Sequence, residues 1–397
     1  MLVGLGTLSV CFSLLFLFAM TSDFSLNEDS YGPIELAADP NQKTLEKLPT
    51  CMRNTATLDR YQPSREQWEQ CLDPGTKPSV YLSIVIVTRM DDYAGGQYHR
   101  FQNFIDSAFL LAEHTKEHIE LLIVEWNPPK DKRRIVDVFR FRHSNYLSYR
   151  IITVPKKIHD FLPNRGNSPL HEFEGKNVGI RFARGEFIVC TNQDDIWSHN
   201  FHNAIKSRVF KKNVIYLQYQ APHNIHENFP PSIVDLPAFP DDDTLYNACR
   251  LEDQNWGHYQ LPEPIKVTTD RENNFILNVA DQAGDFTLAH RDTWKVPRGY
   301  REKGGVAWMD IEFICTATWT FDIPVVYSDK SFCCHQQHNN VWEANTEQHN
   351  DNTDVNMGDI ERKEKSYMNE DGQWALQQVD IWDMGLECLS FYGGLCW

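Results

Sequence analysis

The sequence has no excess of positive charge: its 397 residues include 38 Lys and Arg against 55 Asp and Glu, a formal net charge of −17. This balance disfavours recognition of nucleic acid through a basic surface, so we expect no nucleic-acid partner. No C-x-x-C pair and no G-x-x-x-x-G-K-[ST] phosphate loop occurs, which argues against a zinc site and a P-loop. The sequence also has no N-x-S/T acceptor for N-glycosylation. The 41% of hydrophobic residues is enough for a sizeable globular core.

A single apolar run is long enough to cross a membrane. Residues 1–20 carry no charged side chain, and as a helix they would span about 30 Å, the thickness of a bilayer core. Acidic residues follow this run, which favours a type II signal anchor; a cleaved signal peptide is the alternative. We therefore expect a Golgi or ER membrane protein with a lumenal domain, or a secreted protein if the run is cleaved.

Ten cysteines fit such an oxidising compartment. Cys51 and Cys71 bracket a short segment, and we expect them to form a local clasp. Cys190 lies within an apolar strand and is expected to be a buried free thiol. Four more cysteines are expected to staple the carboxyl end: Cys333, Cys334, Cys388 and Cys396. Their connectivity stays open, because one sequence does not determine it.

Beyond the apolar run, the chain divides into a stem, a core and a tail. Residues 21–79 are polar and are expected to form a stem or linker, with a short helix over Ser64–Cys71 that begins at a capping box. Residues 80–345 alternate between apolar and helical patterns and form the expected α/β domain. Residues 346–397 are acidic and then aromatic, and we treat them as a carboxyl-terminal tail.

The α/β domain is predicted from strands that alternate with helices. The expected strands are Val80–Thr88, Ile119–Trp126, Arg150–Pro155 and Gly185–Thr191. The expected helices between them are Tyr98–Glu113, Lys132–Arg142 and Leu170–Arg184. This alternation predicts right-handed crossovers and a mostly parallel sheet flanked by helices.

Polar side chains follow each of these strands. Acids and amides come after the first, second and fourth strands, and Lys156, Lys157 and Arg165 come after the third. Parallel sheets bind ligands at the carboxyl ends of their strands, where acidic oxygens suit Mg²⁺ or Mn²⁺. Each feature also has a structural alternative, since an Asp pair after a strand can cap a helix and a Lys pair can be solvated surface.

The segment Lys176–Trp197 resembles GT-A glycosyltransferases, closest to the family-2 type. It matches their pattern of a helix with Lys-Asn and Gly, then Ala-x-Gly-Glu, a strand, an Asp-x-Asp motif and Trp. Asn192 replaces the first aspartate of that motif, while Asp194 and Asp195 match the acids that follow. The resemblance covers about residues 80–340 and implies a Rossmann-like sheet with a nucleotide-sugar half, residues 80–197, and an acceptor half, residues 198–345.

The resemblance also implies roles for individual residues. Its donor-binding residues are Thr88, Arg89, Asp91, Asp92, Glu125, Asn127, Lys176, Asn177 and Asn192. Asp194, Asp195 and His335 are the implied metal ligands, with His338 in reserve. Asp310 is the implied general base of an inverting enzyme and Glu312 the second choice, although acids also favour helix starts.

The activity implied is metal-assisted transfer of a hexosyl or N-acetylhexosaminyl group from a nucleotide-sugar to a hydroxyl of a glycan, glycoprotein or glycolipid, with Mn²⁺ or Mg²⁺ as cofactor. The inverting or retaining outcome stays open. One alternative is a nucleotidyltransferase on a similar sheet, although the first strand is not followed by a glycine-rich basic loop. Another is a non-catalytic carbohydrate-binding protein derived from such an enzyme, for which Asn192 is the best support.

Overall fold

The computed structural model describes residues 63–162, 168–218, 233–249, 261–267, 284–302, 309–328, 331–338, 357–364 and 367–393. All of these residues belong to one compact unit, residues 49–397. None of the helices formed by these residues has the length and apolarity needed to span a bilayer. The expected anchor, residues 1–20, lies outside the described residues.

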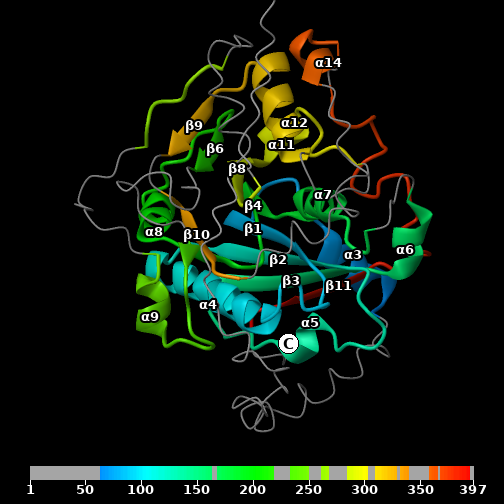
Figure 1. Ribbon diagram of the computed structural model, residues 1–397. Coiled ribbons are helices and arrows are strands. Elements are labelled where there is room, and N and C mark those ends of the chain that lie inside the picture. Colours follow the sequence, from blue (N-terminus) through cyan, green and yellow to red (C-terminus); the bar gives the residue numbers. More distant parts are fainter. Residues whose placement is uncertain are drawn as a thin grey trace, which may run out of the picture. The chain divides into compact units, whose positions relative to one another are not determined.

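The described strands form one large and one small sheet (Figure 1). The large sheet has eight strands in the order β11-β3-β2-β1-β4-β8-β6-β9. Their bounds are β1 Val80–Thr88, β2 Ile119–Trp126, β3 Leu147–Val154, β4 Gly185–Thr191, β6 Ile215–Gln218, β8 Phe286–His290, β9 Val325–Ser328 and β11 Glu387–Phe391. The small sheet consists of β5 Asp195–Trp197, β10 Cys333–Gln336 and β7 Ile233–Val234.

The predicted α/β class with a mostly parallel sheet is confirmed. Strands β3, β2, β1 and β4 are parallel neighbours, and so are β6 and β9. Strands β11 and β8 run antiparallel to their neighbours. The first, second and fourth strands have the bounds that the sequence predicted, because their apolar runs are buried on both faces.

Helices cover both faces of the large sheet (Figure 1). The helices are α3 Arg65–Leu72, α4 Gln97–Thr115, α5 Ile135–Val138, α6 Lys156–Phe161, α7 Glu172–Phe182, α8 His199–Lys206, α9 Asp242–Asn247, α11 Arg291–Lys295, α12 Met309–Cys315 and α14 Met357–Glu361, with a π-helical turn over Thr316–Thr320. Ile84 and Ile86 of β1 pack in the core that contains α4 residues, and Val85 and Val87 pack in the core that contains α7 residues. Helix α3 begins at the predicted capping box.

Two glycines let α7 lie directly on β1. A Cβ atom at Gly175 or Gly179 would stand less than 3.0 Å from the side chain of Val87 or Val85, respectively. Any larger residue at these positions would push the helix away from the sheet. The close approach of α7 to β1 positions Lys176, between the two glycines, 3.5 Å from Asn192 at the end of β4.

The predicted helix over Lys132–Arg142 is wrong in extent. Only Ile135–Val138 is helical, and the chain continues extended from Phe139. Phe139 and Phe141 are buried in the core on the α4 face while Arg140 between them is exposed, an alternation that suits extended backbone.

The disulfides differ from the expected staples. Cys71 is bonded to Cys388, 317 residues away, and this rules out a clasp with Cys51. Cys334 is bonded to Cys249, 85 residues away, and Cys333 is a buried free thiol, so neither staples the carboxyl end to itself. The expected buried thiol of Cys190 is confirmed. Both Cys51 and Cys396 lie outside the described residues.

Candidate metal centre

The ends of β1 and β4 are tied together by side chains. Thr88, the last residue of β1, donates its hydroxyl to Gln193, which follows β4. Gln97 at the start of α4 donates its amide to both, at 3.3 Å from Thr88 Oγ1 and 2.9 Å from Gln193 Oε1. The donor-side strand end and the acidic motif therefore meet at one edge of the sheet.

Two overlapping groups of candidate metal ligands lie at this edge. Asp194, His335 and His338 form one group, and Asp195, Asp285 and His335 form the other. In the first, His335 Nε2 lies 2.9 Å from His338 Nε2, which lies 3.5 Å from Asp194 Oδ2. Ligand atoms about 2.1 Å from one ion stand roughly 3.0–3.4 Å apart, so these separations fit a shared divalent cation.

His335 connects the two groups through its two ring nitrogens. Its Nδ1 faces Asp195 Oδ1 at 3.3 Å, Asp194 Oδ1 at 3.7 Å and Asp285 Oδ2 at 3.8 Å. Burial opposes a charged imidazole, but these three carboxylates outweigh burial and raise the pKa of His335 to about 10. Burial and the neighbouring Asp285 also raise the pKa of Asp195. The site thus concentrates negative charge that a cation would neutralise.

Strand β10 and helix α4 hold this edge in place. Asp194 Oδ2 lies 3.3 Å from Arg100 Nε, and the same guanidinium donates to the carbonyls of Tyr93 and Gly95. The backbone N–H of Gln336 donates to the Asp194 carbonyl at 3.0 Å. Arg100 therefore joins the loop after β1 to the first of the acidic ligands.

That loop makes its own internal contacts. Arg89 donates to the carbonyl of Asn127 at 2.9 Å and pairs with Asp91 at 2.5 Å. Asp92, at a positive φ of 61°, accepts from the N–H of Gln97 at 3.2 Å. Asp92 therefore contacts the start of α4, as expected if the pair Asp91 and Asp92 served to cap a helix.

Glu125 and Asn127 are used at the start of α5 and beside the loop before α7. Buried Glu125 accepts from the Ile135 N–H at 3.0 Å and from Arg134 Nε at 2.7 Å. Asn127 donates its side-chain amide to the Pro169 carbonyl at 3.0 Å. Glu125 stands in register with Thr88, but its carboxylate is turned toward Arg134.

Asn192, at the position of the missing aspartate, lies between a cation and an anion. Its carbonyl oxygen is 3.5 Å from Lys176 Nζ, and its NH₂ group donates to Asp285. A carboxylate here would face Asp285 with like charge, whereas the amide satisfies both neighbours. Asp285, the residue immediately before β8, supplies the acid that the motif lacks.

Lys176 and Asp310 occupy the other side of this centre. Buried Lys176 donates to Gly284 at 3.2 Å and pairs with Glu172 at 2.6 Å. Burial favours the neutral amine, but Glu172 outweighs it and raises the pKa of Lys176. Asp310 at the start of α12 faces Gly284, and burial raises its pKa to about 7 against the opposing effect of Lys176.

Two of the expected site residues have structural partners instead. Glu312 is fully buried and ion-paired with Arg301. Asn177 donates to the Tyr300 carbonyl at 2.7 Å and to Glu302 at 2.9 Å, so it holds the loop before α12.

The structure therefore gathers part of the expected set. It brings together Thr88, Lys176, Asn192, Asp194, Asp195, Asp310 and His335, with His338 beside them. The carboxylates or amides of Glu125, Asn127, Asn177 and Glu312 are turned to other partners. Asp285 was not among the site residues that the sequence predicted, and it joins them as an acid of the second ligand group.

No protein family model and no characterised protein sequence matches this chain. Among solved structures, S. aureus TarS 1–349 is 13% identical with a TM-score of 0.37, covering 76% of this chain and 73% of that one. GalNAc-T7 with UDP, GalNAc and Mn²⁺ is 11% identical with a TM-score of 0.35, over 66% and 44% of the chains. The catalytic domain of Drosophila β1,4-galactosyltransferase 7 is 13% identical with a TM-score of 0.34, over 73% and 84%.

Proposed function

We propose that this chain is a glycosyltransferase that moves a hexosyl or N-acetylhexosaminyl group from a nucleotide-sugar to an acceptor hydroxyl. The observation that carries the proposal is the meeting of two acid–histidine groups with Lys176 and Asp310 at one edge of the sheet. This is the edge where parallel sheets bind ligands. The resemblance of Lys176–Trp197 to GT-A enzymes selects glycosyl transfer among the reactions that such a site can support.

Asp194, His335 and His338, with Asp195 and Asp285 beside them, would hold the cation. Mixed carboxylate and imidazole ligands suit Mn²⁺ better than Mg²⁺, which prefers oxygen ligands. When bound, the ion supplies Lewis-acid neutralisation of the leaving nucleoside diphosphate. Lys176 would add a charge-assisted hydrogen bond to a phosphate oxygen.

Asp310 is the proposed general base. A carboxyl group with a pKa of about 7 is matched to proton abstraction near neutral pH. Its place beside Gly284, the residue before Asp285, puts it next to the metal centre. Glu312 is the less suitable choice, because its ion pair with Arg301 occupies it.

The domain halves and the membrane segment are part of the same proposal. Residues 80–197 would bind the donor, and residues 198–345 would frame the acceptor. Residues 1–20 would anchor the enzyme in the Golgi or ER membrane with its catalytic domain in the lumen, or release it to secretion if cleaved. The two disulfides support an oxidising compartment.

A donor screen tests the transfer. The full-length chain is incubated with Mn²⁺, a panel of UDP- and GDP-sugars and a mixture of oligosaccharide acceptors, and released nucleoside diphosphate is measured. We expect one donor to be consumed, and consumption to stop when EDTA removes the metal. Release of sugar 1-phosphate in place of nucleoside diphosphate would point to the nucleotidyltransferase alternative, and no turnover of any donor would contradict the proposal.

A further inference from the structure

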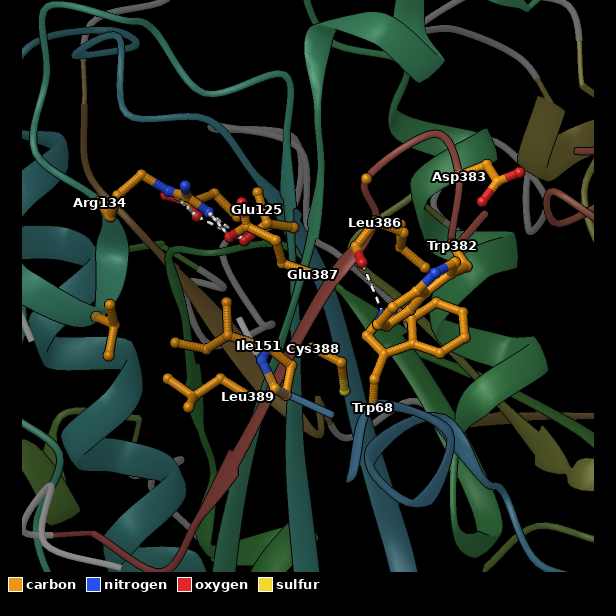
Figure 2. A pocket seen from close by; sticks show the side chains of 14 residues that line it. Trp68, Glu125, Arg134, Ile151, Trp382, Asp383, Leu386, Glu387, Cys388 and Leu389 are labelled. Carbon is orange, nitrogen blue, oxygen red and sulfur yellow. Dashed lines mark hydrogen bonds and ion pairs between the residues drawn. The ribbon is translucent and has the colours of Figure 1, made fainter. Parts of the chain in front are cut away.

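A cavity lies at the β11 edge of the large sheet, and its walls on the two sides of β11 differ in chemistry. Its volume is about 500 Å³, within the range of small-molecule sites. We name it the β11 groove, lined among others by Trp68, Glu125, Arg134, Trp382 and Glu387. Figure 2 shows Arg134 and Glu125 on one side of β11, and the two tryptophans with Asp383 on the other.

The aromatic wall is held in a fixed orientation. The Trp68 indole donates to the Leu386 carbonyl at 2.7 Å and meets Trp382 edge to face, with ring centroids 5.0 Å apart. Trp68 is buried, whereas Trp382 is partly exposed. The Arg65 guanidinium lies 5.9 Å from the centroid of the Trp382 ring, so a sugar ring can stack on this partly exposed indole only where Arg65 leaves its surface open.

The polar wall is an arginine between two carboxylates. Arg134 donates to Glu125 at 2.7 Å and lies 3.1 Å from Glu387. The Glu387 side chain is 57% exposed, so a ligand can reach this ion pair. Together the guanidinium and the carboxylate offer both donors and acceptors, which match the neighbouring hydroxyls of a sugar.

The net charge of the groove favours neutral ligands over anionic ones. Among the described residues that line it are three carboxylates, Glu125, Asp383 and Glu387, and one guanidinium, Arg134, with the Arg65 guanidinium near Trp382. An excess of negative charge opposes phosphates and acidic sugars, while neutral hydroxyl groups carry no such penalty.

The β11 side of the groove is remote from the metal centre. Strand β11 is four positions from β4 in the sheet, which corresponds to about 19 Å at ~4.8 Å per strand. Cys71 of α3 is bonded to Cys388 of β11, so a covalent link joins the two elements that carry Trp68 and Glu387. The β11 side of the groove is therefore distant from the proposed chemistry, whereas Glu125, the register partner of Thr88, lines the side nearer to it.

We propose that the β11 groove binds a neutral oligosaccharide, with Trp382 as stacking platform and the Arg134–Glu387 pair as the hydroxyl-binding group. Binding itself does not depend on the transferase proposal. Its use in capturing the remote part of an acceptor glycan rests on that proposed function, since binding energy far from the reacting group can support catalysis.

Isothermal titration with the full-length chain tests the groove. The probes are maltotetraose, cellotetraose, xylotetraose and chitotetraose, in EDTA and without nucleotide, so that failure of transfer does not affect the result. We expect at least one probe to bind. Trp382→Ala should weaken it about tenfold or more, and Glu387→Gln should also weaken it.

Tyr392→Ala is the matched control, because Tyr392 is exposed, follows β11 and does not line the groove. It should leave the affinity unchanged, and circular dichroism checks that each variant is folded. Binding of none of the four probes, or equal binding by wild type and both groove variants, would overturn the proposal. Displacement of the sugar by UDP in EDTA would overturn it as well, because the groove would then be a nucleotide site.

Discussion

At the scale of single residues, the proposed chemistry depends on ionisable side chains that are buried away from solvent. Asp310 and Lys176 are both buried, and the pKa of each is shifted by burial and by a neighbouring charged group. Burial raises the pKa of Asp310 to about 7, while the nearby Glu172 carboxylate favours the charged form of Lys176. A base and a fixed cation can therefore coexist at one edge of the sheet.

Asp310→Asn should lower turnover by about 10²-fold or more, because an amide cannot accept the acceptor proton. In the wild type, kcat/KM should rise as pH increases through about 7, where Asp310 loses its proton. Asp322→Asn is the control, since Asp322 is exposed. Unchanged turnover in Asp310→Asn would remove this residue from the role of base.

Stability should have the opposite pH dependence to activity. The folded-state pKa of Asp310 is raised from 3.8 to about 7, so the folded state holds a proton that the unfolded state has lost. The free energy of unfolding should therefore fall as pH rises from about 4 to about 7. Buried Glu302, whose pKa burial also raises to about 7, adds to this trend. Urea unfolding should show a smaller fall in Asp310→Asn than in the wild type, and an identical fall would contradict the raised pKa.

Asn192→Asp should make stability depend on metal. The new carboxylate would face Asp285, so without metal we expect a lower melting temperature than in the wild type. Mn²⁺ should raise the melting temperature more in this variant than in the wild type, because a bound ion offsets the repulsion. Asn213→Asp, at an exposed position, is the matched control. An equal Mn²⁺ response in variant and wild type would place the ion away from residue 192.

At the scale of elements, the contact of α7 with β1 positions Lys176. Gly179→Ala would place a methyl group against Val85, and we expect the free energy of unfolding to fall by about 1–3 kcal/mol. Adding Val85→Ala should cost less than the sum of the two single changes, because the second change makes room for the first. If denaturant unfolding showed that the free-energy losses of the two single variants simply add in the double variant, the close contact between Gly179 and Val85 would be contradicted.

Elements with strong patterns were predictable from the sequence, and those with mixed patterns were not. Strand Val80–Thr88 is a continuous apolar run buried on both faces, so its bounds were predicted correctly. The segment 132–142 carries many charges, and its end is decided by the burial of Phe139 and Phe141 against other elements. Tertiary packing of this kind leaves no local signal.

At the scale of the whole molecule, the parts of the site that sequence analysis missed are those brought in by distant pairing. Asp285 reaches His335 only because β8 pairs with β4 and β10 pairs with β5. Glu125 faces the β11 groove, where a strand from residues 387–391 contributes Glu387. The same holds for the disulfide between Cys71 and Cys388, whose spacing in sequence gives no hint of their contact.

Removing that disulfide tests how much the covalent link between α3 and β11 contributes to the free energy of unfolding. Cys71→Ser with Cys388→Ser should lower the free energy of unfolding by about 2–5 kcal/mol, because it frees a loop of 317 residues in the unfolded state. Cys249→Ser with Cys334→Ser, which frees 85 residues, is the comparison and should cost less by this argument. A larger loss in the shorter loop would show that local packing, not chain closure, dominates.

The central claim is that side chains from separate elements hold a cation that presents a nucleotide. Isothermal titration of UDP and GDP into the full-length chain, with Mn²⁺ or with EDTA, tests it most directly. We predict that one nucleotide binds only with Mn²⁺, and that Asp194→Ala abolishes this binding while the chain stays folded by circular dichroism. Equal nucleotide binding in EDTA, or in Asp194→Ala, would contradict the account.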